Sequence, residues 1–295
     1  MIVTKFIAGI LLVFAVTTSV VAQTDEIGQM WSAQNDTARI NPFKPQYLQI
    51  EFDEIKERFL TQPNFGMYKD NYFITGVPIN KAINNQTADA KFQISIRQRL
   101  FNTIMPFNTQ LMLIYTQKSF WDIYEKSFPF ADNNYNPGLL LTKPIVNNDS
   151  YKGVVLFSIE HESNGKDSLE NRSWNYITLS GIYFFNINFH VQAKVWYGWA
   201  DKDNSDLFDY RGYGLIALNF RSRNERIATS LILNPTRNFS VNTQLEINYK
   251  INKRANQFLF LQWYDGYGEG LLDYNKYTSM VRAGICIKPI FRKLY

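Results

Sequence analysis

The stretch VNTQLEINYKI at residues 241–251 decides the fold class of this chain. Its odd-numbered positions carry mostly apolar side chains, such as Leu245 and Ile247, while its even-numbered positions carry polar or charged ones, such as Glu246. This period of two predicts a β-strand with one face in an apolar environment and the other face in a polar one. Residues 187–199 repeat the pattern, so the strand is one of a series.

Twelve segments with this pattern follow one another from about residue 70 to the end of the chain. No helical periodicity separates them, which excludes a parallel α/β fold, because the strands of such a fold alternate with helices. Two classes remain, a soluble β-sandwich and a transmembrane β-barrel. The predicted strands are 71–77, 91–101, 110–121, 138–145, 153–163, 172–185, 187–199, 210–222, 226–235, 240–251, 257–268 and 278–288.

Three features of these strands favour the barrel. Many of them are long enough to cross a bilayer at a tilt, which takes roughly 9–11 residues. Their polar faces carry full charges, as a water-filled lumen allows, and their connections alternate between short and long, as in outer-membrane barrels. The sequence therefore predicts an all-β fold, a twelve-stranded antiparallel transmembrane β-barrel with a short N-terminal periplasmic segment.

The N-terminal part of the chain differs from the strands. Lys5 precedes an apolar run at residues 6–16 that is too short to span a bilayer, and small residues end it at Ala22. This pattern predicts a secretory signal peptide at residues 1–22, with an uncleaved anchor as the alternative. Residues 23–69 are polar and lack alternation, so we expect a periplasmic segment there and the barrel with its site at 70–295.

Composition excludes several classes of site and partner. The chain has one cysteine, Cys286, so an intrachain disulfide and a multi-cysteine metal site are both excluded. The net charge is +5, with no long basic block, so the sequence predicts no nucleic-acid partner. Aromatic residues make up 16% of the chain, which indicates an ordered protein.

Three polar side chains lie where the alternation places lipid. In the predicted strand 153–163, His161 and Ser163 share the face of apolar residues such as Phe157, and Asn175 takes the same face of the next strand. Polar groups facing hydrocarbon are costly unless they pair with one another. A serine, a histidine and an asparagine can do so, and they also form a hydrolytic arrangement of nucleophile, base and orienting group. The strand order places them at the depth of the outer leaflet.

The same residues have a structural interpretation. The pattern H-x-S is common in strands, and Ser-Asn-Gly at residues 163–165 has the composition of an ordinary turn. The shared outward orientation of three polar side chains adds weight to the catalytic interpretation, while the structural one stays open.

Five strings then carry a resemblance to a known family. Residues 161–165 and 172–175 match its H-x-S-N-G and R-S-W-N, with Asn175 following His161 by 14 residues as in the family. Three other strings resemble its Y-T-Q-K-S-W-W, N-Y-E-P and G-Y-G-E-S-L-I-D-Y-N. These are YTQKSFW at 115–121, NYNP at 134–137 and GYGEGLLDYN at 266–275. From about residue 70 onward the chain therefore resembles outer membrane phospholipase A.

The resemblance implies a twelve-stranded barrel in the bacterial outer membrane with its active site at the outer leaflet. It implies calcium-dependent hydrolysis of sn-1 and sn-2 acyl esters of phospholipids and lysophospholipids, by an enzyme that is active as a homodimer. Carried over, Ser163 is the nucleophile, His161 the base and Asn175 the group that orients His161. The Gly165 N–H would contribute to the oxyanion hole.

The implied calcium ligands transfer less directly. They are the backbone oxygen of Lys166, the side chain of Asn171 and, from a second subunit, Ser127. The family has arginine and serine where this chain has Lys166 and Asn171. The first change matters little for a backbone ligand, and the carbonyl oxygen of Asn171 suits calcium. Gln117 matches the glutamine of the family's dimer interface.

A second functional interpretation is a non-enzymatic barrel, such as a small porin or an adhesin. Twelve strands leave a narrow lumen, and the charged and aromatic inner face would close it, which counts against a porin. Loss of activity in Ser163→Ala with the barrel still folded would separate the two.

Overall fold

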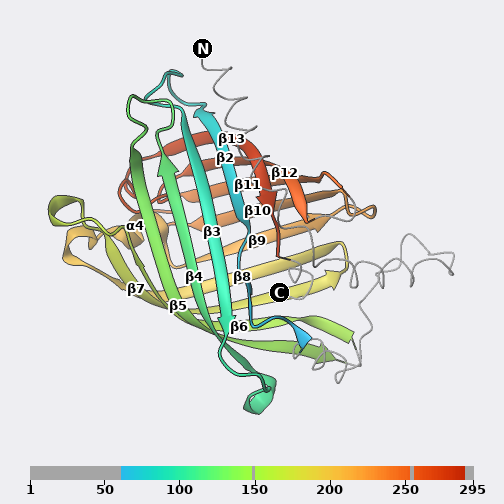
Figure 1. Cartoon of the computed structure of the whole chain (residues 1–295). Coiled ribbons are helices and arrows are strands. Elements are labelled where there is room, and N and C mark those ends of the chain that lie inside the picture. Colours follow the sequence, from blue (N-terminus) through green and yellow to red (C-terminus); the bar gives the residue numbers. More distant parts are fainter. Residues whose placement is uncertain (1–60, 148–149, 253–255, 290–295) are drawn as a thin grey trace.

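The computed structural model describes residues 61–147, 150–252 and 256–289 (Figure 1). The predicted signal peptide and most of the 23–69 segment lie outside these residues. Twelve antiparallel strands form a closed barrel, because the last strand pairs with the first long one and each other strand pairs with its neighbours in the sequence. No helix in the described ranges is both long and apolar enough to span a membrane.

The predicted fold class is confirmed. A short strand, β1 (Phe65–Met67), pairs with β3 beside the first barrel strand. The barrel strands are β2 (Asn71–Pro78), β3 (Asp89–Arg99), β4 (Gln110–Trp121), β5 (Phe130–Asn147), β6 (Ser150–Ser163), β7 (Ser173–Asn186), β8 (Phe189–Ala200), β9 (Gly214–Arg221), β10 (Ile227–Pro235), β11 (Val241–Lys250), β12 (Gln257–Gly266) and β13 (Thr278–Ile287). Between the described strands lie the helix α4 (Leu207–Arg211) and the 3₁₀ turns η2 (Pro106–Asn108), η3 (Ser168–Glu170) and η4 (Lys202–Asn204).

Two predicted strands were wrong in their extent. β5 begins at Phe130, well before the predicted 138, because Pro137 and Gly138 resemble a turn but here continue the sheet. The predicted strand 210–222 begins instead with helix α4. The helix ends at Gly212, whose φ of 60° favours glycine, so the strand starts only at residue 214.

The barrel is apolar outside and polar inside. On β6 the outward Phe157 and Ile159 are 41% and 50% exposed, while the inward Ser158 and Glu160 are buried. The same alternation runs along β7 and β8. This is the face pattern of a transmembrane barrel, in which outward side chains contact lipid.

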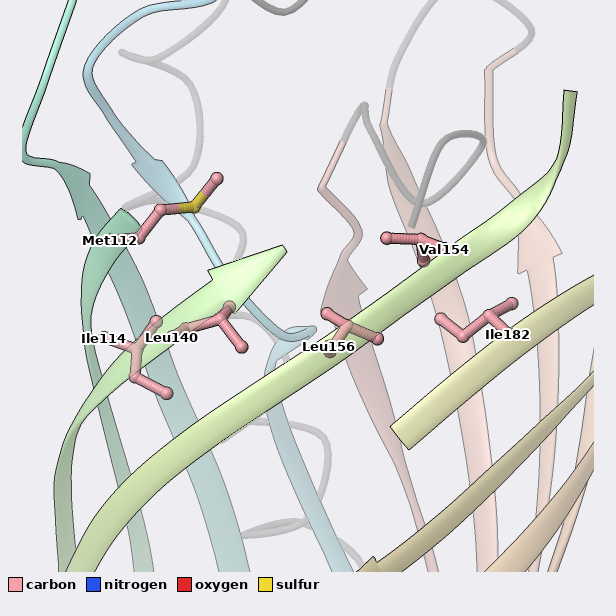
Figure 2. Packing of buried hydrophobic residues seen from close by; sticks show 6 residues of the cluster. All are labelled: Met112, Ile114, Leu140, Val154, Leu156 and Ile182. Atoms are coloured by element: carbon pink, nitrogen blue, oxygen red, sulfur yellow. The ribbon is translucent and has the colours of Figure 1, made fainter. Parts of the chain in front are cut away.

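Side chains fill the lumen near its short-turn end. Figure 2 shows an apolar cluster there, built from inward residues of β4, β5, β6 and β7, and Tyr68 and Phe184 pack against it. The cluster consists of Met112, Ile114, Leu140, Val154, Leu156 and Ile182.

The connection between β12 and β13, residues 267–277, closes the other end from within. Its Glu269 forms ion pairs of 2.7 Å with Lys91 of β3 and with Arg282 of β13. The buried Leu271 donates a backbone hydrogen bond of 3.0 Å to Asp132 of β5. The connection is therefore tied to several strands, and it fills this end of the lumen together with an aromatic cluster around Trp174.

Candidate active site

His161 and Asn175 face each other across β6 and β7. They are direct partners in the strand register, and His161 Nδ1 lies 2.9 Å from Asn175 Oδ1. Since an amide oxygen only accepts, this contact assigns the ring proton to Nδ1 and leaves Nε2 free to accept a proton. Both side chains are half-buried on the outer face of the barrel. The structure brings this pair together on the outer face of the barrel.

Ser163 lies two residues further along β6, on the same outer face. Its register partners are Tyr135 on β5 and Ser173 on β7. Among the described residues, the Ser163 hydroxyl makes no hydrogen bond, and its side chain is half-exposed. Residues at this spacing have Cα atoms about 7 Å apart, a gap that side chains leaning together can close. Catalytic hydrogen bonds are often longer before substrate binds.

Gly165 begins the turn that follows the strand. Its φ is +67°, a left-handed conformation that glycine adopts without strain. A Cβ atom on this residue would lie only 2.9 Å from Cε2 of the Tyr135 ring. Glycine is therefore required here both for the backbone conformation and for the close approach of the tyrosine.

Asn164 organises the loop 164–172, which extends well beyond the turn that the composition of residues 163–165 indicates. Its buried side-chain oxygen accepts hydrogen bonds from the backbone N–H of Arg172 at 3.0 Å and of Lys166 at 3.3 Å. Its side-chain N–H₂ donates to the carbonyl of Glu170 at 2.7 Å. An asparagine two residues before a backbone donor is a known turn signal, but the bonds to Arg172 and Glu170 at the far end of the loop could not be predicted from it.

Two of the predicted calcium ligands, Lys166 and Asn171, lie in the same loop. The side chain of Lys166 forms a 2.8 Å ion pair with Glu170, and this hydrogen bond lowers the pKa of the Glu170 carboxyl. Asn171 donates to the carboxylates of Asp203 at 3.1 Å and Asp201 at 3.4 Å. The sequence analysis missed these two aspartates because they belong to the connection after β8.

The donor set around Asn171 suits calcium chemically. It consists of carbonyl, amide and carboxylate oxygens, which are the ligands that hard cations prefer. Within the described ranges, no group of three or more histidine, cysteine, aspartate or glutamate side chains is placed to hold a metal ion. A calcium ion here would depend on backbone and amide oxygens. Ser127 lies in the 122–129 connection, at the same end of the barrel as the loop 164–172.

Gln117 is part of a polar row on the outer face of β4. Tyr115 donates a hydrogen bond of 3.2 Å to the Gln117 side-chain oxygen, and Gln117 donates one of 3.1 Å to Ser119. Ser119 in turn donates to Asn133 of β5 at 2.7 Å. The amide is therefore paired within the chain, which lowers the cost of placing it against lipid.

The comparisons with known proteins agree with this geometry. The Phospholipase A1 family model matches residues 26–287. Phospholipase A1 of Escherichia coli (strain K12) is 32% identical over 223 residues, which are 71% of this chain and 73% of that protein. A protein named putative phospholipase A1 from Neisseria meningitidis serogroup B is 29% identical over 216 residues, 69% of this chain and 55% of that protein.

Solved structures give the same family. Outer membrane phospholipase A from Escherichia coli superposes with a TM-score of 0.68 and 27% identity, over 79% of this chain and 97% of that one. The calcium-bound dimer of the Salmonella typhi outer membrane phospholipase gives a TM-score of 0.69 at 27% identity, over 80% and 98% of the two chains. The chain therefore belongs to the phospholipase A1 family, as a twelve-stranded barrel enzyme of the outer membrane.

Proposed function

We propose that this chain hydrolyses sn-1 and sn-2 acyl esters of phospholipids and lysophospholipids, with Ser163 as nucleophile, His161 as general base and Asn175 as the orienting group. One observation carries the proposal. The 2.9 Å contact between His161 and Asn175 lies on the lipid-facing surface, beside a half-exposed serine. Membrane lipids meet the protein on this surface, so their ester bonds can reach the serine without entering the barrel.

The first half of the reaction transfers the acyl group to the protein. The Ser163 hydroxyl attacks the ester carbonyl while His161 Nε2 takes its proton. Asn175 Oδ1 accepts from Nδ1–H and so keeps Nε2 available as the base. When the tetrahedral intermediate collapses, the imidazolium gives its proton to the leaving alcohol oxygen of the lysophospholipid. Because asparagine is neutral, it stabilises the imidazolium less than an aspartate would.

The second half of the reaction releases the fatty acid. A water molecule attacks the acyl-enzyme while His161 accepts one of its protons, and that proton then returns to Ser163 Oγ. In both halves the carbonyl oxygen becomes negatively charged and needs hydrogen-bond donors that are already in place. The backbone N–H of Gly165, two residues after the nucleophile, is suited to that role because the left-handed turn redirects the chain at this point.

Calcium would be held by the backbone oxygen of Lys166, the side-chain oxygen of Asn171 and, from a second copy of the chain, Ser127. When bound, it supplies positive charge that stabilises the developing oxyanion. The carboxylates of Asp201 and Asp203 beside Asn171 add to the negative potential of this loop region. The calcium-bound dimer of the Salmonella typhi relative supports this part of the proposal.

The active form would be a homodimer that associates through the outer face carrying Gln117. That face bears a row of hydrogen-bonding side chains where the alternation favours apolar ones, and a second copy would shield it from lipid. Dimerisation would also deliver Ser127 to the calcium ligands of the other copy. No observation favours the porin alternative, and the ion-paired connection across the lumen speaks against it.

The experiment is hydrolysis of phospholipid in mixed micelles by the refolded protein, with calcium and with excess chelator. Ser163→Ala is compared with Ser173→Ala, since Ser173 lies directly opposite on β7 and also faces outward. We expect fatty-acid release that depends on calcium. Ser163→Ala should abolish this release, and the Ser173→Ala protein should retain it. Equal activity in the two variants, or full activity in chelator, would contradict it.

A further inference from the structure

The pairing between β5 and β6 is interrupted opposite the proposed base. The two strands are paired up to Gly138 with Glu160, and again at Tyr135 with Ser163. In this register Pro137 stands opposite His161. Proline has no backbone N–H, so it cannot donate a ladder hydrogen bond to the neighbouring strand. The carbonyl of His161 therefore lacks the backbone donor that other positions of this strand pair receive.

A side chain supplies the missing donor. Asn136, the residue before the proline, donates through its Nδ2 to the His161 carbonyl oxygen at 2.9 Å. The Asn136 side chain is 7% exposed and lies on the lumenal side, behind the strand that carries the proposed site. An unsatisfied buried carbonyl is costly, so this contact fixes the backbone of His161 in place.

The same amide reaches the strand that carries Asn175. Asn136 Nδ2 also donates to the Tyr176 hydroxyl at 2.9 Å, and this hydroxyl donates to Glu160 at 2.9 Å. Tyr176 follows Asn175 in the chain, and Glu160 precedes His161. One buried asparagine thus contacts the backbone of the proposed base and the neighbour of its orienting partner.

We propose that Asn136 is a positioning residue that fixes the His161 backbone from inside the barrel and thereby holds the imidazole in register with Asn175 and Ser163. The inference rests on the proposed function for its effect on catalysis. It makes a separate structural claim about the imidazole, which can be measured without activity.

The first test is kinetic. Asn136→Leu keeps the approximate volume and removes the donor, and we expect kcat to fall about 10- to 100-fold with KM nearly unchanged, because a small misplacement of a catalytic group has this effect. Asn248→Leu is the matched control, a buried asparagine whose Nδ2 lies 3.5 Å from the carbonyl of Ala228 on another strand pair. We expect it to retain the wild-type kcat.

Two further variants separate positioning from general stabilisation. Tyr176→Phe removes the link to Glu160 but leaves the bond from Asn136 to His161, so its loss of kcat should be much smaller. The double variant Asn136→Leu/Pro137→Ala restores a backbone N–H opposite His161 and should recover part of the lost kcat. Equal losses in Asn136→Leu and Tyr176→Phe, or no recovery in the double variant, would overturn the assignment.

The second test is spectroscopic. The chain has two histidines, so the imidazole ¹⁵N spectrum of the refolded protein contains two sets of signals, which His190→Gln assigns. We expect Asn136→Leu to change the tautomer signals of His161 from the Nδ1–H form toward a mixture, and to leave those of His190 unchanged. An unchanged His161 spectrum would overturn the proposal. If the wild-type protein released no fatty acid, the proposed function would fail, while these spectra would still decide the role of Asn136.

Discussion

The β6–β7 and β10–β11 hairpins are built alike, but their outer faces differ at the same end of the barrel. In β10–β11, the outward pairs from Leu231 with Leu245 to Pro235 with Val241 at the loop carry one polar side chain, Thr243. In β6–β7 the outward pairs are apolar as far as Ile159 and Ile177. The next two outward pairs toward the loop are polar, although outward residues of the barrel are mostly apolar. They are His161 with Asn175 and Ser163 with Ser173. The proposed catalytic groups therefore lie in the last two residue pairs of the β6–β7 hairpin before its loop.

The inner faces of the two hairpins also differ. Behind β6–β7, Glu162 accepts hydrogen bonds from Trp174 at 2.9 Å and from Arg211 at 2.7 Å. Behind β10–β11, Glu246 Oε2 and Asn248 Oδ1 are buried without a hydrogen-bond partner among the described residues. Thr178 Oγ1 on the inner face of β7 is likewise buried without a hydrogen-bond partner among the described residues. The two hairpins therefore differ in where the bonds lie, since those of Glu162 are directly behind the proposed site and can hold its groups in place.

The largest effect is expected from substituting the proposed base, which tests whether the polar outward pairs of β6–β7 are catalytic. His161→Gln should lower kcat about 10³- to 10⁴-fold, because the base is lost while binding remains. The control is His190→Gln, whose ring packs against Phe184 at a centroid distance of 4.8 Å. Phospholipid hydrolysis at saturating substrate measures both. A His161→Gln variant that retains activity would remove the functional contrast between the hairpins.

Substituting Asn175, the proposed orienting residue, should lower kcat by a smaller factor. Asn175→Ala should lower kcat about 10- to 100-fold, because the imidazole loses the acceptor that sets its tautomer. Asn175→Asp keeps an acceptor oxygen and should retain most of the activity. The pair of variants is assayed in the same micelles, and an aspartate variant as weak as the alanine variant would show that the contact has another role.

A substitution in the turn after Ser163 should lower kcat less strongly. Gly165→Ala forces a left-handed backbone on alanine and brings its Cβ to 2.9 Å from the Tyr135 ring, a strain of about 1–3 kcal/mol. We expect kcat to fall about tenfold, as the proposed oxyanion donor shifts. Gly181→Ala on β7 is the control, since nothing lies within 4 Å of its added Cβ. Equal kcat values for the two alanine variants would argue against a role for the Gly165 N–H.

The smallest effect concerns the connection that fills the lumen rather than the site. Burial raises the pKa of Glu269, but the charges of Arg282 and Lys91 outweigh burial and hold this pKa at about 2. Since the folded value lies below the ordinary value of about 4.3, the ion pairs stabilise the barrel fully above that pH. Their contribution is lost as the pH falls toward 2.

Urea unfolding of the wild-type protein and of Glu269→Gln measures this contribution at several pH values. The difference in unfolding free energy should be constant above about pH 5 and should shrink as the pH falls below the ordinary carboxyl value. Activity at neutral pH should change little, because Glu269 lies inside the barrel. A difference that persists unchanged to pH 2 would mean that Glu269 is not held by these charges.

The alternation predicted most of the fold because a barrel strand has one apolar and one polar face along its whole length. It also predicted the outward orientation of His161, Ser163 and Asn175, since orientation depends only on parity within a strand. It failed at residues 130–137, where asparagines and Pro137 resemble a turn, and at residues 207–211, where a short helix interrupts the strand series. Both errors arise because the sheet context overrides local preference.

The contacts that support the site were not predictable in the same way. The bond from Asn136 to His161 and those from Asn171 to Asp201 and Asp203 join residues 25 to 32 positions apart. They depend on the register between neighbouring strands and on the path of the connections. Alternation within one strand carries no information on either. The family strings pointed to the proposed reactive residues, and they included Asn136 and Asn164 without indicating what these two side chains contact.

Chemical labelling of the nucleophile is the most direct test of the proposed active site on the outer face of β6. The refolded protein is treated with a long-chain alkylsulfonyl fluoride, which forms a covalent sulfonyl ester with an activated serine, and the adduct is located by peptide mass spectrometry. We predict one adduct, on Ser163. The substitution His161→Gln should slow its formation strongly, and Ser173→Ala should leave its formation unchanged. An adduct on another residue, or equal labelling of Ser163 in His161→Gln, would contradict it.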